Sequence, residues 1–486
     1  MGRTFARCLV SVLALGAVSA CSSAPGNLKV DMDAVAKRQD RRLIEGTVEA
    51  PVPLADRGKA GPEGTLARDV ADVFAESPWA LEAMLGLSAQ NYSVAQVETA
   101  NGPRVDLNGN AGGTDSKGAT EFKGTAGVGA ALGWTVYDPS EGPRSDRERF
   151  RAAAQVRTVH ERGELIGANV VESHIDVPRH RSLVALRGRE IAEKERFLKR
   201  DVAKAVSLGM ASEADRANAA ASAKKAKDSL SDSSRNLKDA EDRYFRLLGR
   251  RPVEMAEPAP LEVDTDKEAE VAKAAGHPSL GVIYANIQAA VANAVAVDAE
   301  RLGSFGLDAG LTWSKVLASG INPFALSANF LKVALPLVDS GERGARVAKS
   351  VATVQVGEAQ MAQTERDVAM SVRLAHNAWA SAVERRAIAE ARLKDVRSVL
   401  ATYKAEYADG LRSTNDVLRA IDDAYDAEAT AVNARYTAVY ASYVVQAKQG
   451  RLLKTLGAVD FVEVNVDGQT DPWERVALSK GLFVRK

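Results

Sequence analysis

Several stretches of the chain alternate strictly between apolar residues and small or polar ones. In residues 126–136, Ala, Val, Ala, Leu, Trp and Val fill every second position, with Gly, Ala and Thr between them. A period of two predicts β-strands with one apolar face, and about eleven residues is the length that a tilted strand needs to cross a membrane. The same pattern recurs at the positions Leu307, Ala309, Leu311 and Trp313, and again at Leu331, Val333, Leu335 and Leu337. With a change of period near Val105 and Leu107, we expect four strands, joined by surface loops in the Gly- and Asn-rich stretches 108–118 and 319–323.

The rest of the pattern is helical, and some of the helices are very long. A helix is expected from Pro78 to Thr99, because Pro suits a first helical turn. Residues 345–408 contain no Pro and a single glycine, Gly357, which predicts a helix of about 95 Å. From Leu418 onward, apolar residues at steps of three and four form one helical face. Helices of this length cannot fold into a compact core, so we expect them to pack side by side, as coiled-coil-like pairs or as the wall of a tube.

The whole pattern occurs twice, about 200 residues apart. Pro78 and Leu107 correspond to Pro278 and Leu307, and Tyr137-Asp138 corresponds to Val338-Asp339. Gly209-Met-Ala-Ser-Glu-Ala-Asp215 returns as Gly410-Leu-Arg-Ser-Thr-Asn-Asp416. Each copy therefore predicts one unit with the order helix, two strands, long helix, turn, helix, in which Gly209 and Gly410 mark the turn. The fold class that follows is mainly α, with long antiparallel helices and four β-strands per chain.

Composition excludes several classes of protein. Aromatic residues are only 5% of the chain and charged residues 26%, which is typical of long helices rather than of compact cores. Lys plus Arg equals Asp plus Glu at 64 each, so we expect no nucleic-acid partner. The two cysteines, Cys8 and Cys21, both lie at the N-terminus, so no cofactor or metal held by cysteine is expected elsewhere.

The N-terminus has the pattern of an export signal. Arg3 and Arg7 precede an apolar run over residues 9–20 that is too short to span a bilayer as a stable helix. Val18-Ser-Ala-Cys21 resembles a bacterial lipobox, which implies cleavage before Cys21 and a lipid on its sulfur; an ordinary signal peptide with a chance cysteine is the alternative. Ser22 is not the Asp that resembles an inner-membrane retention signal, so we expect sorting to the outer membrane. No apolar run beyond Cys21 approaches 18 residues, and we therefore expect no membrane-spanning helix.

These signals divide the chain into six parts. Their ranges are 1–20 (signal peptide), 21–66 (lipidated extension), 67–254 (first repeat), 255–267 (linker), 268–457 (second repeat) and 458–486 (C-terminal tail). Four membrane strands cannot close a barrel, and an open sheet edge in lipid leaves backbone groups unsatisfied at several kcal/mol each. The chain is therefore expected to form a homo-oligomer whose pooled strands close a barrel and whose helices surround a conduit.

At this point the residues resemble a known family. The lipobox, the duplicated units and the segment Tyr407-Ala-Asp-Gly-Leu-Arg412-Ser-Thr-Asn-Asp416 together resemble the TolC family of outer-membrane channels, over roughly residues 75–457. The resemblance implies a homotrimer with a 12-stranded barrel among the outer-membrane lipids of a Gram-negative bacterium. It also implies a tunnel of long helices in the periplasm, docked to a periplasmic adaptor (membrane fusion) protein and to an inner-membrane ABC or proton-driven transporter.

The family also implies a gate at the periplasmic end. Tyr407 and Arg412 stand where the family's tyrosine and arginine engage an Asp of the first repeat, here Asp215, one within and one between subunits. Asp416 matches an Asp that lines the narrowest aperture, where an acidic ring favours cations. This chain departs from the pattern at Arg419, which replaces an acidic residue of the best-known members and opposes that selectivity. Alternatively, Asp215 and Asp416 belong to helix N-caps of the type Ser-x-x-Asp and act only on local helix stability.

The expected function is the exit duct of a tripartite export system. Ala240-x-x-Arg243-Tyr244, with Gly249 and Pro252, resembles members that serve type I protein secretion, whereas a lipid anchor is commoner among multidrug-efflux members. Protein secretion is therefore the favoured interpretation, small-molecule efflux the alternative, and a lipid-anchored coiled-coil adaptor without a pore a further one. We expect no enzyme, because the five histidines show no metal spacing and no phosphate loop or nucleophile motif is present. His174 and His180 are expected to be solvated.

Overall fold

The computed structural model describes residues 47–51, 64–76, 78–114, 123–316, 324–335, 341–457 and 461–465. The predicted signal peptide and the lipidation site Cys21 lie outside the described residues. So do Val338 and Asp339 of the repeat comparison and the expected loop 319–323.

Both repeats have the predicted order of elements. In the first repeat these are α5 (Pro78–Thr99), β2 (Arg104–Thr114), β3 (Lys123–Tyr137), α6 (Glu141–Arg196), the π-helix η1 (Phe197–Val202), α7 (Ala203–Ser207) and α8 (Glu213–Leu248). In the second they are α10 (Pro278–Ala299), the 3-10 helix η3 (Glu300–Leu302), β4 (Ser304–Val316), β5 (Phe324–Ala334), α11 (Glu342–Ala408) and α12 (Thr414–Lys448). The shorter elements are β1 (Thr47–Pro51), α4 (Leu66–Glu76), α9 (Lys267–Ala272), the 3-10 helix η2 (Lys273–Gly276), α13 (Leu452–Leu456) and β6 (Phe461–Asn465).

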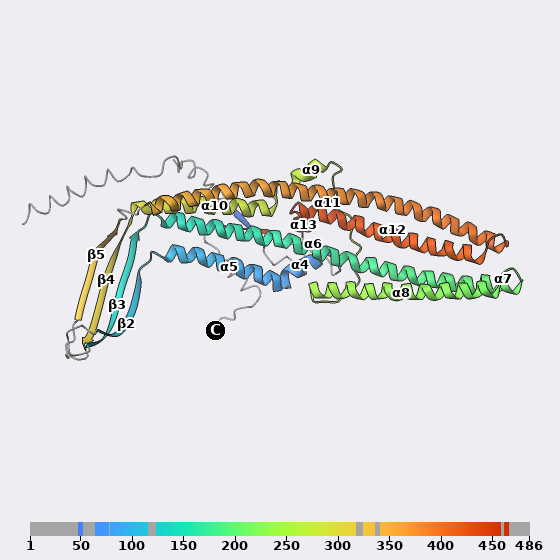
Figure 1. Cartoon of the computed structure of the whole chain (residues 1–486), viewed down its shortest axis with the longest axis horizontal. Coiled ribbons are helices and arrows are strands. Elements are labelled where there is room, and N and C mark those ends of the chain that lie inside the picture. The colour runs from blue at the N-terminus through green and yellow to red at the C-terminus, as the bar shows by residue number, and fades with distance from the viewer. Residues whose placement is uncertain are drawn as a thin grey trace, which may run out of the picture.

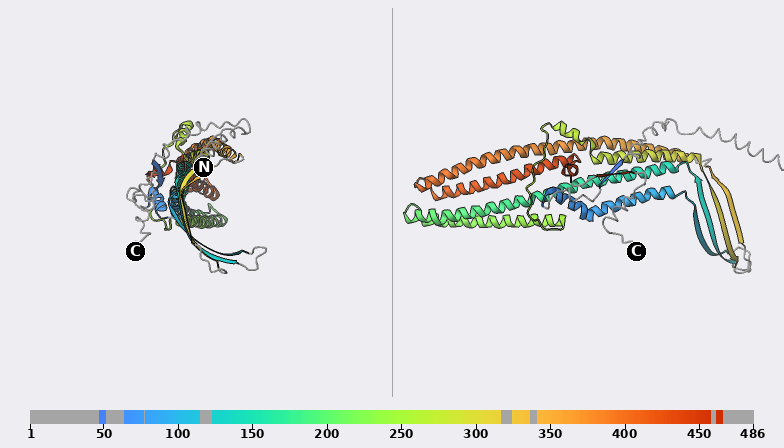
Figure 2. Two further views of the ribbon diagram at one scale, coloured as in Figure 1. Left: turned by 90° about the vertical axis from the view of Figure 1, so that its left-hand side faces the viewer. Right: turned by 180° about the vertical axis from the view of Figure 1, so that it is seen from behind.

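The helices run side by side, with the strands at one end and the two helix turns at the other (Figure 1). Near the strands the packing order is α5, α6, α10, α11, and near the turns it is α8, α6, α12, α11. Seen along its length, the molecule is a curved wall and not a closed bundle (Figure 2). The expectation of lateral packing is therefore confirmed.

The four strands form one antiparallel sheet in the order β2-β3-β4-β5. Two sequence expectations about these strands are corrected. Residues 108–114, expected to be loop, belong to β2, because every one of them is paired with β3 from Gly129 to Lys123. In β5 the strand ends at Ala334, so Leu335 lies beyond it, and Leu337 falls outside the described residues. Pairing with a neighbouring strand overrides the low strand propensity of Gly and Asn.

The expected extension and tail also contain paired structure. Thr47–Pro51 (β1) pairs antiparallel with Phe461–Asn465 (β6), from Thr47 opposite Asn465 to Pro51 opposite Phe461. This small sheet joins the two ends of the described chain and lies against α6. Neither strand was expected from the sequence.

The two largest apolar clusters among the described residues pack the helices against one another. The larger one, at mid-length, joins α4, α6 and α12 with α13 through residues such as Phe74, Val170 and Tyr443. The second lies near the turns and contains Phe197, Tyr407 and Ile421. The apolar face expected on α12 is therefore confirmed, since Ile421, Tyr436, Val439 and Tyr443 are buried.

One helix departs from an expectation. By length and composition, Pro278–Leu302 could cross a membrane, with a mean hydropathy of 1.6. The sequence has no unbroken apolar run here, because single polar residues such as Asn286 and Asn293 interrupt it. Since 44% of that window is buried and α10 lies between α6 and α11, we interpret it as a helix of the wall.

Candidate functional site

The sheet carries an exposed apolar face. Along β3, Val128, Leu132, Trp134 and Val136 are each more than two-fifths exposed, while the residues between them are Gly, Ala and Thr. Cross-strand pairing places neighbouring apolar residues beside them: Val105 is opposite Leu132, and Val128 is opposite Trp313. Leu107, at 85%, is among the most exposed of these side chains. Such a large exposed apolar surface marks contact with a membrane or a partner.

The edge strands of the described sheet continue into the outer helices of the wall. β2 has a neighbour only at β3, and β5 only at β4, so each leaves one edge unpaired among the described strands. β2 follows α5 on one side of the wall, and β5 precedes α11 on the other. Each side is therefore an edge of the molecule from the strands to the turns.

At the opposite end, two turns of the same design close the helix pairs. Gly209 and Gly410 adopt positive φ angles of 72° and 75°. The next residue in each turn donates its backbone N–H to the carbonyl five positions back: Met210 to Ala205 O at 2.9 Å, and Leu411 to Glu406 O at 2.8 Å. This is the Schellman arrangement, which ends a helix and needs a left-handed residue, usually Gly. The structure therefore agrees with the assignment of both glycines to the turn.

Each turn then starts its next helix with a capping box. The Ser212 hydroxyl accepts a hydrogen bond from Asp215 N at 3.2 Å, and the Asp215 carboxylate accepts one from Ser212 N at 2.9 Å. Ser413 and Asp416 form the same pair of bonds at 3.2 Å and 3.3 Å. These bonds from Ser212 hold the pKa of Asp215 below its ordinary value. For Asp416, a hydrogen bond from the Ser413 hydroxyl at 2.8 Å and the bond from Ser413 N likewise hold the pKa below its ordinary value. Within one chain, both aspartates therefore belong to the capping boxes of their helices.

Tyr407 is buried between helices. Its side chain is 9% exposed, its ring lies 5.1 Å from the ring of Phe197, and its hydroxyl is 3.2 Å from the Thr414 hydroxyl. Tyr407 therefore fastens the end of α11 to η1 and to the start of α12.

Arg412 is tied to its own turn. Its Nε donates to Glu406 at 2.5 Å, and its guanidinium lies 4.2 Å from the centre of the Tyr403 ring. The hydrogen bond from Arg412 to Glu406 holds the pKa of the guanidinium above its ordinary value. In one chain, Asp215 thus bonds Ser212 instead of Tyr407 or Arg412, and the gate network stays a prediction about an assembly of several copies.

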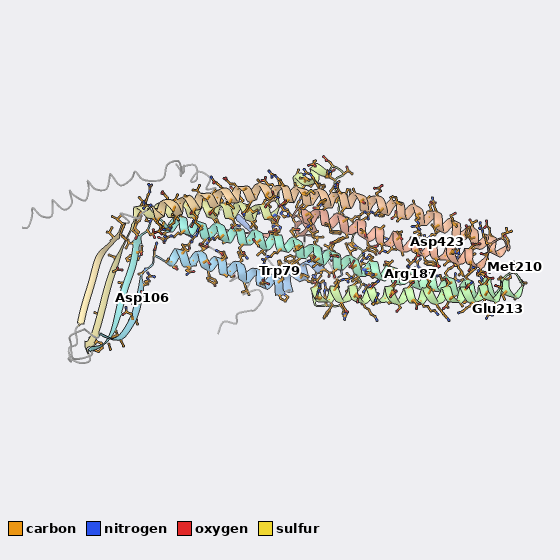
Figure 3. The ribbon with its side chains drawn as sticks, viewed as in Figure 1. Trp79, Asp106, Arg187, Met210, Glu213 and Asp423 are labelled. Atoms are coloured by element: carbon orange, nitrogen blue, oxygen red, sulfur yellow. The ribbon has the colours of Figure 1, made fainter. Side chains whose placement is uncertain are left out.

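A set of ion pairs that the sequence did not reveal joins α6 to the second helix pair. Lys194, which is 1% exposed, contacts Glu190 at 2.9 Å and Asp422 on α12. Arg187 contacts Asp426 at 3.0 Å, and Arg189 contacts Glu428 at 2.7 Å. Figure 3 places Arg187 and Asp423, a neighbour of these acids, in the half of the wall toward the turns. The only sequence signal was the cluster of acids on α12, which by itself indicates a solvated face.

Burial acts to raise the pKa of Glu190, but hydrogen bonds from Arg187 and Lys194 outweigh it and leave that pKa below the ordinary value. Glu190 is therefore charged at neutral pH and takes part in the ion pairs.

The turns expose apolar side chains to solvent. Leu411 is 75% exposed, Leu208 62% and Met210 54%. Met210 and Glu213 lie at the end of the molecule remote from the strands (Figure 3). Exposed apolar residues at a charged helix end are a candidate contact for a partner.

The described residues hold no group of three or more His, Cys, Asp or Glu side chains that could bind a metal. One histidine expectation is wrong: His174 is fully buried and hydrogen-bonded, whereas His180 is partly exposed. The sequence could not reveal this burial, because His174 is covered by a separate segment, α4, whereas its spacing from His180 describes α6 alone.

Comparison with known proteins agrees with this geometry. Residues 272–447 match the profile of the outer membrane efflux protein family. The Campylobacter jejuni outer membrane channel CmeC superposes with a TM-score of 0.66 at 12% identity, covering 90% of this chain and 94% of CmeC. The Neisseria gonorrhoeae channel MtrE, in its open state, has a TM-score of 0.61 at 17% identity and covers 83% and 91%. CusC has a TM-score of 0.66 at 14% identity and covers 80% and 91%. No curated protein matches the sequence.

The fold of the chain is therefore that of outer-membrane channels built from long helices and a small sheet. Residues 272–447 carry an outer membrane efflux protein domain, and the resemblance to the TolC family is confirmed. Proteins of this class are transport ducts and not enzymes.

Proposed function

We propose that three copies of this chain form an outer-membrane exit duct, in which each copy is one third of the wall. The observation that carries the proposal is that the open edges of the sheet lie on the same sides of the molecule as the outer helices of the wall. Strand β5, which has one edge unpaired among the described strands, forms one side together with helix α11, and β2, α5 and α8 form the other. Head-to-tail joining of unlike edges generates a closed ring when the rotation closes. Ring closure would pair β5 of one copy with β2 of the next and satisfy their backbone groups in lipid.

The apolar face of the sheet supports its place in the membrane. Trp134, Trp313 and Leu311 would contact lipid in the ring, and the helices would extend the bore into the periplasm. The wall order near the turns puts α8 and α11 at opposite sides. A ring therefore brings Asp215, at the start of α8, toward the α11–α12 turn of the next copy. That neighbourhood supports an expected link between Asp215 of one copy and the turn that carries Tyr407 and Arg412 in an adjacent copy.

The duct is tested by assembly and conduction together. Native mass spectrometry of the detergent-extracted protein is expected to give three times the chain mass, and planar bilayers are expected to show discrete channel openings. A monomer that forms no openings would favour the coiled-coil adaptor instead. Asp106, on the neighbour-free edge of β2, offers a finer probe: a cysteine there and one at Ser327 of β5 are expected to crosslink chains to each other.

We further propose that the exposed residues Leu208, Met210 and Leu411 contact a periplasmic adaptor that links the duct to an inner-membrane ABC or proton-driven transporter. Replacing Met210 and Leu411 by Ser is expected to abolish export while trimers and bilayer conductance persist. Loss of conductance as well would place these residues in the tunnel instead.

The cargo is proposed to be protein, with small-molecule efflux as the alternative. In the segment that resembles secretion members, Tyr244 is buried and Gly249 ends α8 with φ 70°. Both residues therefore also have a structural role. Deletion of the coding region from its host is expected to leave a large protein unsecreted. Increased sensitivity to small toxic compounds, without a secretion defect, would assign the duct to efflux.

The lipid anchor at Cys21 is proposed as a second attachment to the outer membrane. Cys21→Ser is expected to prevent lipid labelling and to leave the trimer intact, because the strands hold the membrane by themselves. A native protein whose mass equals the unlipidated chain would exclude the anchor.

A further inference from the structure

A buried polar cluster at mid-length of the wall joins segments that are far apart in the sequence. Asp69 on α4 and His174 on α6 are both fully buried, with His174 Nδ1 2.6 Å from Asp69 Oδ2. The Tyr244 hydroxyl donates to the same oxygen at 2.9 Å, and Arg250 donates to Oδ1 at 2.7 Å. We call Asp69, His174, Tyr244 and Arg250 the clasp. Nothing in the proposed duct uses them.

The second ring nitrogen of His174 faces the linker between the repeats. His174 Nε2 lies 3.4 Å from the carbonyl oxygen of Ala256. The N–H of Ala256 donates to Gly64 O at 3.0 Å, so Ala256 lies between α6 and the segment that precedes α4. Both nitrogens of His174 thus face oxygens. A neutral imidazole has one N–H and can donate to one of them, whereas an imidazolium donates to both.

Charged side chains from two other segments surround His174. From α4, Asp69, Asp72 and Arg68 face the cluster, and Arg250 enters from the segment after α8. The two carboxylates and two guanidiniums balance each other. Burial raises the pKa of Tyr244, so its hydroxyl stays a neutral donor.

We propose that the clasp is a proton-operated catch: when His174 carries two protons, it fixes the linker at Ala256 and α4 to the wall, and loss of one proton releases the linker. In the neutral form with Nδ1–H bonded to Asp69, the Nε2 lone pair points at the Ala256 carbonyl, and two acceptors face each other in a buried place. Acid therefore tightens the attachment of the N-terminal segment and of the linker, and alkali loosens it.

Hydrogen exchange on the full-length protein in detergent tests this proposal. Exchange of peptides covering residues 64–76 and 250–260 is measured at pH 6 and pH 8 and corrected for the intrinsic rates. We expect about three- to tenfold greater protection at pH 6, where a tenfold change corresponds to about 1.4 kcal/mol. Equal protection at the two pH values in the wild type would overturn the proposal without any variant.

Variants identify the group responsible. His174→Gln is expected to remove the difference between the two pH values, whereas His180→Gln, on the same helix with its Nε2 3.3 Å from Arg179, is expected to keep it. Asp69→Asn keeps the shape of the side chain and withdraws the charge that favours the imidazolium, so it is expected to shrink the difference. Retention of the full difference in both His174→Gln and Asp69→Asn contradicts the catch. Bilayer conductance reports on the duct separately, so failure of the two proposals is distinguishable.

Discussion

The turn between α7 and α8 and the turn between α11 and α12 have the same hydrogen bonds, 201 residues apart. Their surroundings differ. The first turn follows a π-helix, Phe197–Val202, and its polar side chains bond mainly within the turn. Near the second turn, Tyr407 packs on Phe197, and Lys404 pairs with Glu193 of α6. The two turns therefore share one backbone design. A few side chains near the second turn, such as Tyr407 and Lys404, attach it to the first helix pair.

The π-helix adds to this difference. Such segments are uncommon and are frequently found at functional sites inside α-helices. Residues 141–207 of the first repeat and 342–408 of the second are helical throughout, and α11 has no such interruption. The Tyr407 ring thus lies against the π-helical segment of the first pair, through its contact with Phe197.

The largest expected effect is on Tyr407. Tyr407→Ala leaves a cavity between η1, α11 and α12 and should cost about 3 kcal/mol of local stability. Hydrogen exchange of residues 400–421 measures this loss. Tyr92→Ala is the control, since Tyr92 is 61% exposed and its removal should change little. Equal effects of the two substitutions would mean that Tyr407 does not fasten the second turn.

The next effect separates the two glycines. Ala in the left-handed region costs about 1–2 kcal/mol, so Gly209→Ala and Gly410→Ala should both destabilise their turns. A Cβ at Gly410 would also lie 2.9 Å from Met210 Cε, whereas one at Gly209 meets nothing within 4 Å. We expect Gly410→Ala to be moderately worse, because the Met210 side chain can move aside. Thermal unfolding of both variants decides this, and a larger effect at Gly209 would contradict it.

A functional test concerns Arg412. Arg412→Ser combined with Tyr407→Phe removes two groups of the expected gate and keeps the buried ring, so single-channel conductance should rise with little loss of stability. Arg216→Ser is the matched control at the first turn, where Arg216 pairs with Glu213 at 3.5 Å. Unchanged conductance in the double variant would remove the gate proposal.

The smallest effect is shared by both turns. Because the folded-state pKa values of Asp215 and Asp416 lie below their ordinary value of 3.8, the caps stabilise their helices fully above that pH. This contribution is lost as the pH falls through the lower folded values. Far-ultraviolet circular dichroism between pH 5 and pH 2 should show a small loss of helix, reduced in Ser212→Ala and Ser413→Ala alike. A loss confined to one variant would show that the two caps are not equivalent.

Most elements of the fold were predictable from the chain. The bounds Pro78–Thr99 of α5 follow from proline at the first turn and from the change of period after it. The strands around Trp134 and Trp313 follow from alternation, and the duplication links the two sets. Residues 108–114 were misassigned because Gly and Asn indicate loops until a partner strand is present, and such pairing is not local.

The candidate site was less accessible. Gly209, Gly410 and both capping boxes were predictable, since each depends on residues within six positions. Lys194 with Asp422, and Asp69 with His174, were not, because each joins residues far apart in the sequence.

The sequence by itself thus determined the repeat, the periods and the turns, because helix, strand and cap preferences act over a few residues. Only the tertiary structure decided which charges are buried, which edges stay open and which helix lies beside which. Those properties arise when segments hundreds of residues apart come into contact and exclude water from the groups between them.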